Sequence, residues 1–487
     1  MARPLLIASL LEPPSSDGIE LTALPASVEW LEVRADLVGD IDPDWLRDHF
    51  RGRLLYSLRI HDSVDSLQRL KTAARYYDRI ELQAGADLSD ELLQHIPPEK
   101  RVISWYGSVS DLTEISERFE HVSSVPAAAY KLVTNANTIA EEFLPLFLLD
   151  SLKRTDTIAF ANGPLGFWNR VAALQFGAPA IFGRVAKDAT AEMEPSIRKL
   201  IDDYGLPDVS TVKEIFAIIG NPIFHSLSPR LHNASYRAMD HSALFVPLRV
   251  DSFAEFWREF VLSRKLDGLG MPINGMTVAS PHKEEALLKA RTVSAMARQA
   301  EAANILIRNN GWWNADTTDP DVIYTASRDR SVPVKEKRAA VIGCGGAGRA
   351  IAAALVNWGA GVTLINRGAE RGEHAASLLG LQYIPLRDFD AEGYDIVVNA
   401  TPVGRDSDEV PFEIERLNDD AVVIDLVYGS RPTPLIDTTR ARRQIAIDGR
   451  DVLVAQVRHQ FRMMTGKEMS VALAQQLLGR STQKAPT

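Results

Sequence analysis

Short apolar runs alternate with amphipathic segments over the first 209 of the 487 residues. Eight runs have the length and composition of buried strands, at 5–10, 28–35, 54–60, 79–84, 101–106, 128–133, 157–161 and 179–185. Segments between them, such as 65–77, 112–119 and 138–152, are amphipathic with helical spacing. Eight strands that alternate with helices predict an α/β fold, a (β/α)₈ TIM barrel whose ligand-binding groups lie at the carboxyl ends of the strands.

Polar residues gather at these predicted strand ends. They are Glu32, Arg34 and Asp36 at the end of the second run, Arg59 in the third, Glu81 in the fourth, Lys131 in the sixth and Arg170 beyond the seventh. Each alone is compatible with a solvated strand end or a long stem over apolar surface. Together, the arginines suit a substrate that carries a carboxylate. Lys131 has apolar neighbours in AAAYKLV, and burial lowers the pKa of an amine, which makes it a nucleophile toward a ketone.

A different pattern begins at the apolar run 339–342, which Gly343, Gly345, Gly346 and Gly348 follow at once. We expect a helix to begin near Arg349, so that its unpaired amides face a pyrophosphate over the turn. The alternative is an ordinary tight turn between a strand and a helix. The strand before the turn and the helix after it favour a dinucleotide-binding Rossmann domain.

The next predicted strand, 361–365, indicates which dinucleotide binds. It ends in Asn366 and Arg367 instead of the acidic residue that would bind the ribose hydroxyls of NAD. Arg371 lies one helical turn further on. Because two guanidinium groups suit a 2'-phosphate, the pattern predicts NADP.

The two regions are joined by residues 186–213, which combine a last barrel helix with a polar linker. A strand at 214–219 then leads through a loop at 220–229 into a helix at 230–239. Ser226 and Ser228 stand just ahead of this helix, where hydroxyls either cap the helix or hold a carboxylate.

Three further polar residues stand out in the second half: Lys283 in GMTVASPHK, on the turn after a predicted strand, Asn304 in EAANILI, before another strand, and Asp319 at the end of TTD. With the glycine turn, NATPVG at 399–404, DLVY at 425–428 and DGRDVLVAQ at 448–456, they resemble shikimate dehydrogenase from Glu214 to about Leu478. The resemblance implies that Lys283, near Asp319, transfers the proton while NADPH supplies hydride. It also implies carboxylate binding by Ser226 and Ser228, contacts to ring hydroxyls from Asn304, Asp319 and Gln456, approach of Tyr428 to the substrate, and a cofactor site that includes Ala347 and Thr401. The chain departs from the family pattern at Thr277, Ala279, Thr317 and Arg405.

The stretches LEVRAD, YSLR, AYKLV and GPLGFWNR resemble type I 3-dehydroquinate dehydratase over about the first 200 residues. The resemblance implies that Lys131 forms a Schiff base with the substrate ketone, in a substrate site that contains Glu32, Arg34, Arg59 and Arg170. Three segments depart from the family pattern: Ser104-Trp105-Tyr106 replaces the general-base motif Ser-x-His, Glu81 and Gln83 replace an acidic pair, and the lid reads TAEME at 190–194.

Tyr106 decides what we expect of the dehydratase. An unperturbed phenol is almost entirely protonated at neutral pH, so it is a poor base. Lys131 or the arginines could lower its pKa, or His61 could reach the proton. The sequence therefore predicts weak dehydratase activity with an alkaline optimum.

The net charge of -10 argues against a duplex nucleic-acid partner. The single cysteine, Cys344, excludes internal disulfides, and without Cys/His clusters no metal site is expected. Glu12, Pro13 and Pro14 follow the apolar start of the chain, which favours a strand over a signal peptide, and no run is long enough to cross a membrane. We expect a cytoplasmic protein whose partners are small molecules.

These patterns predict a dehydratase barrel at 1–209, a substrate-binding domain at 214–316 completed by 467–487, and an NADP-binding domain at 317–466. The predicted function is conversion of 3-dehydroquinate to 3-dehydroshikimate, followed by reduction to shikimate. One alternative is a dehydrogenase with a vestigial barrel, and another is a non-enzymatic quinate-sensing regulator. The preference between shikimate and quinate stays open, as does the oligomeric state.

Overall fold

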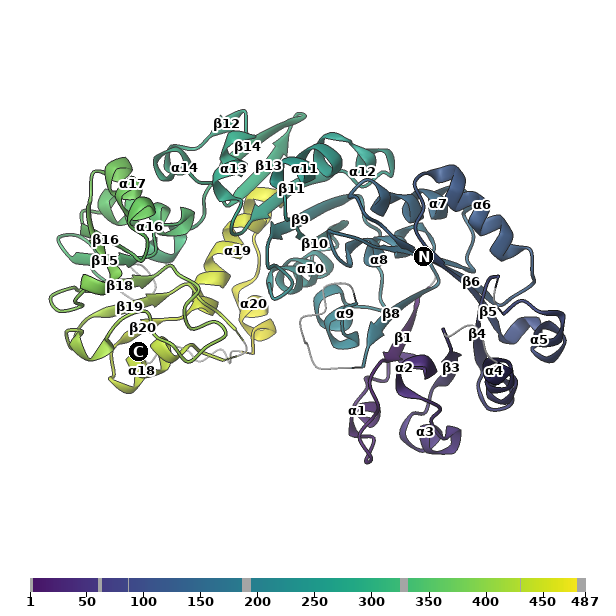
Figure 1. The fold of residues 1–487 in the computed structure, drawn as a ribbon. Helices are drawn as coiled ribbons and strands as arrows, with labels where there is room; N and C mark the ends of the chain where they lie inside the picture. Colours follow the sequence, from purple (N-terminus) through teal and green to yellow (C-terminus); the bar gives the residue numbers. More distant parts are fainter. Residues whose placement is uncertain are drawn as a thin grey trace. The chain divides into compact units, whose positions relative to one another are not determined.

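The computed structural model describes residues 3–59, 64–85, 87–185, 194–324, 332–429 and 431–479 (Figure 1). It divides into two compact units, Met1–Ile215 with Tyr236–Pro272, and Phe216–Ser235 with Ile273–Thr487. The domain boundaries drawn from the sequence remain predictions. His61 and residues 190–193 of the predicted lid lie outside the described residues.

The first unit contains the predicted parallel barrel. Its strands are β1 (Leu5–Leu10), β2 (Val28–Arg34), β3 (Arg53–Ser57), β4 (Arg79–Gln83), β5 (Arg101–Gly107), β6 (Ala129–Asn135), β7 (Thr157–Asn162) and β8 (Ala180–Arg184). They follow one another in the order β7-β6-β5-β4-β3-β2-β1-β8, each parallel to its neighbours. Because β7 and β8 are the ends of this order in the described residues, the barrel is nearly closed. The eight predicted strands are confirmed, with ends that differ by at most about three residues.

Apolar side chains fill the inside of the barrel. One buried cluster consists of Ile7, Trp30, Leu55, Val102, Ala129, Val133, Ile158, Phe160, Ala180 and Phe182. Side chains two residues apart share a face of a strand, so Glu32 joins Trp30 on the inner face and Lys131 lies between Ala129 and Val133. The polar groups of the barrel therefore stand directly on an apolar floor.

Helices cover the outside of this barrel, as Figure 1 shows for α4 to α7. The helical elements are α1 (Ile19–Thr22), α2 (Ala35–Val38), α3 (Pro43–His49), α4 (Val64–Tyr76), α5 (Asp90–His95), η1 (Pro98–Lys100), α6 (Leu112–Ser123), η2 (Glu141–Phe143), α7 (Leu144–Leu152), α8 (Trp168–Ala172), η3 (Ala173–Phe176) and α9 (Ile197–Tyr204).

The same unit includes a later segment with β10 (Ala243–Arg249), α11 (Phe253–Phe256), η4 (Trp257–Leu262) and α12 (Lys265–Gly268). The ring of Phe260 packs against those of Phe143 and Trp168, with centroids 5.4 and 5.2 Å apart. The Arg249 amide donates to the Leu165 carbonyl at 3.2 Å. This segment thus packs on the barrel around η2 and α8.

The second unit begins with strands β9 (Glu214–Gly220), β11 (Ile273–Val278), β13 (Ile305–Asn309), β14 (Trp312–Asp316) and β12 (Thr292–Val293), which follow one another in this order in a sheet. Strand β13 is antiparallel to both β11 and β14. The helices α10 (Ser228–Ala238), α13 (Lys283–Leu288) and α14 (Ala295–Ala300) connect these strands.

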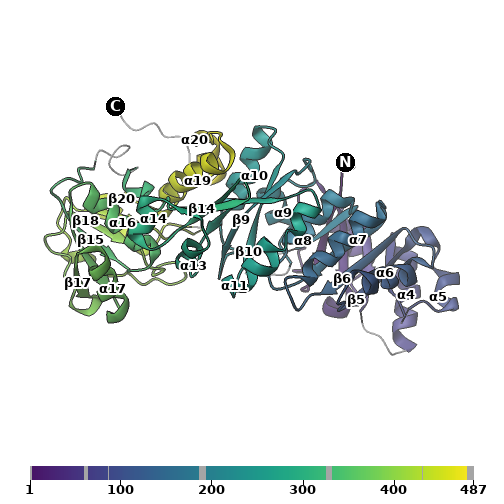
Figure 2. The ribbon, with the colours of Figure 1, turned by 90° about the horizontal axis from the view of Figure 1, so that it is seen from above.

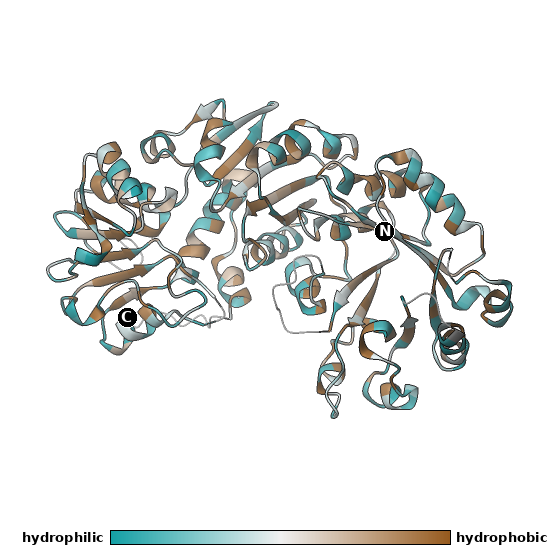
Figure 3. Cartoon of the chain, viewed as in Figure 1, coloured by the Kyte–Doolittle hydropathy of each residue, from teal (hydrophilic) through white to brown (hydrophobic). Residues whose placement is uncertain are grey.

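A second, parallel sheet has the order β17-β16-β15-β18-β19-β20. Its strands are β15 (Arg338–Ile342), β16 (Gly361–Asn366), β17 (Gln382–Pro385), β18 (Ile396–Asn399), β19 (Val422–Asp425) and β20 (Ile445–Ile447). This is the 3-2-1-4-5-6 order of a doubly wound dinucleotide fold, whose crevice lies where β15 and β18 diverge. Figure 3 shows the strands of this sheet as apolar elements, in agreement with buried clusters on both of its faces.

The helical elements around the parallel sheet are α16 (Gly346–Asn357), α17 (Ala369–Leu379), η5 (Leu386–Asp388), η6 (Ile414–Arg416), α18 (Pro434–Ala441), α19 (Gly449–Thr465) and α20 (Val471–Leu477). Helix α19 contacts β11 and β13 of one sheet and β19 of the other, as Figures 1 and 2 show. It can therefore place side chains where the two sheets of this unit meet. Among the described helices, none combines the length and the apolar character that crossing a bilayer requires.

Candidate active sites

Lys131 lies in the barrel between two buried carboxylates. Its Nζ is 3.3 Å from Glu32 Oε1 and 3.4 Å from Glu81 Oε2, and the three side chains are at most 3% exposed. Strands β6, β2 and β4 supply them, so parallel pairing brings together groups far apart in the chain. The prediction of apolar surroundings is wrong for the amine itself. The ring of Phe182 lies 3.9 Å from Nζ, but carboxylates flank the nitrogen.

Tyr106 joins this cluster from β5. Its hydroxyl donates to Glu81 Oε1, and the Arg59 guanidinium carbon lies 4.3 Å from the centre of its ring. Burial, and then the Glu81 charge, raise the pKa of Tyr106 well above its usual value. The expectation that nearby cations lower this pKa is wrong, because burial and the carboxylate outweigh Arg59.

The three predicted arginines of the barrel differ in their hydrogen-bond and ion-pair partners. Arg59 Nη2 is 3.5 Å from Glu32 Oε1, and Arg170, 7% exposed, donates to Asn162 Oδ1 at 2.8 Å. Arg34 is bound instead through two nitrogens to Asp36, at 2.9 and 2.7 Å. In the described part of the chain, Nε of Arg59, Nε of Arg170 and Ser104 Oγ are buried without a hydrogen-bond partner. Unpaired buried donors are costly, so this place suits a ligand rich in acceptors.

Sequence reasoning missed Glu142, which is fully buried in η2. Its Oε1 accepts from the Leu165 amide at 2.7 Å, and its Oε2 accepts from Trp168 Nε1. Burial raises the pKa of Glu142 to about 7. Glu142 therefore holds the turn that leads into Arg170. The available signal was a charged residue beside the apolar helix FLPLFLL.

In the second unit, Lys283 and Asp319 form the centre of a second polar cluster. Lys283 Nζ lies 2.7 Å from Asp319 Oδ2. The other oxygen, Oδ1, accepts from Asn304 Nδ2 at 3.0 Å and from Gln456 Nε2 at 2.9 Å. Four residues predicted from separate motifs are thus in contact, because α13, the residue before β13, the turn after β14 and α19 converge.

Ser226, Ser228 and Tyr428 form a neighbouring group. Ser226 Oγ accepts from the Ser228 amide at 3.2 Å, at the start of α10, and hydrogen-bonds the Tyr428 hydroxyl. Burial raises the pKa of Tyr428. The Asn221 amide donates to the Ser280 carbonyl at 3.0 Å, so the serine loop runs beside the loop that leads to Lys283.

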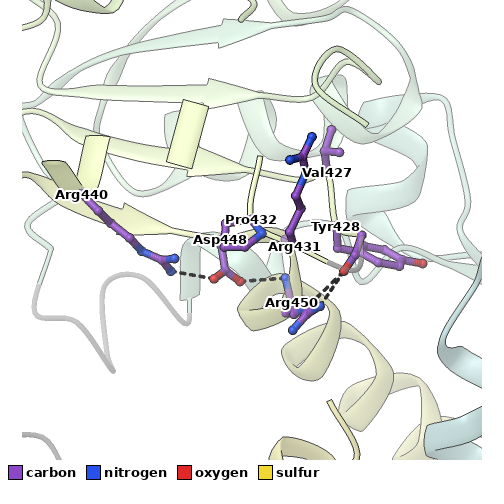
Figure 4. A pocket seen from close by; sticks show the side chains of 9 residues that line it. Val427, Tyr428, Arg431, Pro432, Arg440, Asp448 and Arg450 are labelled. Atoms are coloured by element: carbon purple, nitrogen blue, oxygen red, sulfur yellow. Dashed lines mark hydrogen bonds and ion pairs between the residues drawn. The ribbon is translucent and has the colours of Figure 1, made fainter. Parts of the chain in front are cut away.

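A pocket of about 250 Å³ lies behind the Tyr428 loop (Figure 4). On its wall, Arg450 Nη2 donates to the Gly429 carbonyl at 2.7 Å, and Asp448 pairs with Arg440 at 2.7 Å. Asp448 also caps α19 through the amides of Arg450 and Asp451. These contacts join the Tyr428 loop to the start of the helix that carries Gln456. Arg405, one of the departures from the family pattern, is exposed and acts electrostatically on Tyr428.

The glycine turn after β15 has little room for side chains. A Cβ on Gly348 would lie 1.8 Å from the Gly343 carbonyl oxygen, and Gly343 has a φ of 104°. A Cβ on Gly345 would meet nothing within 4 Å. Helix α16 begins at Gly346, earlier than the predicted start near Arg349. The turn therefore packs tightly on its inner side and is open over Gly345, where its amides could receive a phosphate.

The turn also touches the lysine cluster. A Cβ on Gly346 would lie 2.7 Å from Ala302 Cβ and 3.3 Å from Lys283 Cβ. Arg349, 1% exposed, donates to the Ala300 and Cys344 carbonyls at 2.8 and 3.2 Å and pairs with Glu284 at 2.7 Å. Sequence reasoning treated Arg349 only as the start of a helix, although it anchors the turn beside Lys283.

The remaining predicted cofactor residues flank this turn. Asn366 Oδ1 accepts from the Cys344 amide at 3.2 Å, and Thr401 Oγ1 donates to Asn399 Oδ1 at 2.6 Å. Arg367 and Arg371 are exposed just beyond β16, and Ala347 lies in the first turn of α16. Arg371 lies close enough to Cys344 to act on it electrostatically, although burial raises the pKa of this thiol to about 11.

Comparison with known proteins agrees with both resemblances. Family models match residues 56–211 (type I 3-dehydroquinase), 218–306 (shikimate dehydrogenase substrate binding domain) and 338–429 (NADP oxidoreductase, coenzyme F420-dependent). The shikimate dehydrogenase (NADP(+)) of Ignicoccus hospitalis is 34% identical over 243 residues, which cover 50% of this chain and 89% of that protein. The chain belongs to the shikimate dehydrogenase family.

The resemblance extends beyond that family's usual length. The chloroplastic bifunctional 3-dehydroquinate dehydratase/shikimate dehydrogenase of Arabidopsis thaliana is 26% identical over 522 residues, which cover 96% of this chain and 84% of that protein. A crystal structure of shikimate dehydrogenase in complex with NADP+ is 27% identical with a TM-score of 0.50, over 55% of this chain and 96% of the other. The chain is thus a homologue of the bifunctional enzyme in which both halves are present.

Proposed function

We propose that this chain is a bifunctional enzyme, a lyase and an oxidoreductase. The barrel dehydrates 3-dehydroquinate to 3-dehydroshikimate through an imine at Lys131, and the second unit reduces 3-dehydroshikimate to shikimate with NADPH. The observation that carries the dehydrogenase is the contact between Gly346 and Lys283, because it sets a proton donor beside the dinucleotide turn. For the dehydratase it is a buried lysine between two carboxylates, in a barrel that also contains buried donors without a hydrogen-bond partner among the described residues.

In the dehydrogenase, Lys283 donates its proton to the substrate oxygen as the carbonyl is reduced. Asp319 keeps the ammonium in place, and Asn304 and Gln456 hold Asp319 and bind ring hydroxyls. Ser226, Ser228 and Tyr428 bind the carboxylate. Since Lys283 is 17% exposed, water can restore its proton after each turnover.

The glycine turn fits NADP, which supplies the hydride when bound. The open space over Gly345 would receive the pyrophosphate at the start of α16, a helix of 12 residues. Asn366 ends β16, and Arg367 and Arg371 follow it, where the adenosine ribose lies in this fold. The two guanidinium groups would bind the 2'-phosphate. The rest of the NADP site is formed by Gly343, Gly346, Ala347, Gly348 and Thr401.

In the barrel, the Lys131 nitrogen attacks the ketone, and loss of water gives a cationic imine between Glu32 and Glu81. Arg59 and Arg170 bind the substrate carboxylate and hydroxyls through their Nε atoms, which are buried without a hydrogen-bond partner among the described residues. Arg34 is less suited to bind the substrate, because two nitrogens of its guanidinium group already donate to Asp36.

Both alternatives have less support. A quinate-sensing regulator would not need a lysine–carboxylate pair beside a dinucleotide turn, and a vestigial barrel would not need Lys131 to remain between two carboxylates. The curated relatives named above are enzymes. We also propose small molecules as the substrates, without nucleic-acid or membrane partners, and a cytoplasmic location.

The deciding experiment adds 3-dehydroquinate to the purified chain and then adds NADPH. We expect enone absorbance to rise in the first stage and NADPH to be consumed in the second. A separate assay with 3-dehydroshikimate and NADPH tests the second unit alone. Absence of enone would refute the dehydratase, and lack of NADPH oxidation with 3-dehydroshikimate would refute the dehydrogenase.

A further inference from the structure

Tyr106 and Lys131 are bound by the two oxygens of one carboxylate. The phenol donates to Glu81 Oε1, while Lys131 Nζ lies 3.4 Å from Oε2, which also accepts from Ser57 Oγ at 2.6 Å. In an imine at Lys131, the carbon that loses its proton is two bonds from the lysine nitrogen. A hydroxyl bridged to that nitrogen by a single carboxylate therefore lies near this carbon.

We propose that Tyr106 and Glu81 act as one proton relay for the elimination in the barrel, with Tyr106 touching the substrate carbon. The proposal rests on the proposed dehydratase function. It assigns the base for a chain that has a tyrosine where the related dehydratases have histidine.

The relay balances in two steps. First, the C–H bond beside the imine carbon breaks, its electron pair forms a C=C bond, and the C=N⁺ pair moves to the Lys131 nitrogen, which gives a neutral enamine. The proton goes to the Tyr106 oxygen while the phenol passes its own proton to Glu81. Second, the nitrogen pair re-forms the iminium, the C=C pair moves one bond along, and the C–O bond breaks. The relay returns its proton to the departing hydroxyl, which leaves as water, and a second water hydrolyses the imine.

The charges around Glu81 favour this sequence. Burial raises the pKa of Glu81, but Lys131 and Arg59 lower it more, so it lies well below its usual range in the free protein. The enamine nitrogen is uncharged, so the strongest of these cations is lost as the C–H bond breaks. Glu81 then accepts a proton more readily. The phenol stays neutral throughout, which agrees with a tyrosine whose phenolate is strongly disfavoured.

Other charged groups around the relay have partners of their own. Tyr106 interacts electrostatically with Arg59, with Glu32 on β2 and with Arg170 on α8. Ser57 on β3 donates a hydrogen bond to Glu81. Arginine stays protonated, and Glu32 is bound by Ser9, Ser57 and Lys131. The relay therefore predicts an elimination rate with little dependence on pH above neutrality, in place of the alkaline optimum expected from the sequence.

The test is a single-turnover measurement of elimination by the full chain, followed by enone absorbance from pH 7 to 9. Tyr106→Phe should lower the rate about 10²-fold or more, since proton transfer typically contributes that much. Borohydride should still trap substrate on Lys131 in this variant, and its dehydrogenase activity should be unchanged. Tyr106→His should restore turnover with a pH dependence that the natural chain lacks, because histidine titrates near neutrality.

Tyr56→Phe is the matched control. Tyr56 is a buried phenol of the same barrel that donates to a carboxylate, Asp40 Oδ1 at 2.6 Å, and it lies outside the lysine cluster. Its variant should eliminate normally. A near-normal rate in Tyr106→Phe overturns the relay, as does a tenfold rise of the natural rate per pH unit, which would indicate a phenolate base. Failure of the proposed function differs, because the natural chain then gives no enone.

Discussion

The two units contain lysines in contrasting settings. Lys131 is 2% exposed and lies between two carboxylates in the middle of a parallel barrel. Lys283 is 17% exposed, begins a helix and, among the described residues, pairs with a single carboxylate. A nucleophilic amine must be held rigidly against a carbonyl carbon, whereas a proton donor needs a route to water to regain its proton. The burial of each lysine therefore matches the chemistry proposed for it, and the comparison can be tested one lysine at a time.

The largest effect should come from Lys131→Ala. Without the amine there is neither an imine nor an electron sink, so we expect dehydratase turnover to fall at least about 10³-fold and borohydride trapping to disappear. The dehydrogenase should keep its activity, which also shows that the chain is folded. Lys153→Ala is a suitable control, because this lysine is exposed and pairs only with Asp150 among its described contacts. Trapping that moves to Lys153 or Lys187 would contradict the assignment.

Lys283→Ala should produce the opposite pattern. We expect dehydrogenase turnover to fall by about 10² or more with little change in NADPH affinity, while the dehydratase stays normal. Asp319→Asn should resemble it. Lys289→Ala, at the other end of the same helix, controls for loss of surface charge. Near-normal turnover of Lys283→Ala would mean that another group handles the proton.

The choice of cofactor also separates the two units, since only the dehydrogenase of the second unit should distinguish NADPH from NADH. The natural chain should prefer NADPH over NADH by at least about tenfold, because one charge-assisted phosphate contact contributes roughly 1.5 kcal/mol or more. Arg367→Ala combined with Arg371→Ala should abolish most of this preference. Arg387→Ala, an exposed arginine beside Asp388, should not. Steady-state kinetics with both cofactors measure the effect, and equal efficiency in the natural chain would refute NADP.

The smallest effect should come from pH, and it should be confined to the barrel. The pKa of Glu142 is raised to about 7 in the folded chain, so its contribution to stability is complete below the unfolded value near 4.5 and is lost as the pH rises through 7. Between pH 6 and 8 the barrel should lose about 1 kcal/mol relative to Glu142→Gln, which does not titrate. Hydrogen exchange of the amides at 163–169 would measure it. Equal pH dependence in both proteins would contradict the prediction.

The sequence by itself determined the strands of the barrel, the dinucleotide turn and the two lysines. These follow from local patterns: apolar runs of strand length, four glycines after a buried strand, and short motifs around Lys131 and Lys283. Local rules suffice there because alternation and turn geometry depend on neighbouring residues. The expectation that Lys283, Asp319, Asn304 and Gln456 serve one site needed the family resemblance as well, since four separate elements supply them.

Only the tertiary structure decided what surrounds each group. Lys131 meets Glu32 across 99 positions, which no local pattern records. The pKa of Tyr106 is governed by burial and by Glu81, so its direction could not follow from the arginines alone. Glu142 and Arg349 looked ordinary in the sequence, because a buried charge is recognised only by the partners that surround it. Electrostatic energies depend on distance and on the exclusion of water, and both are properties of the packed chain.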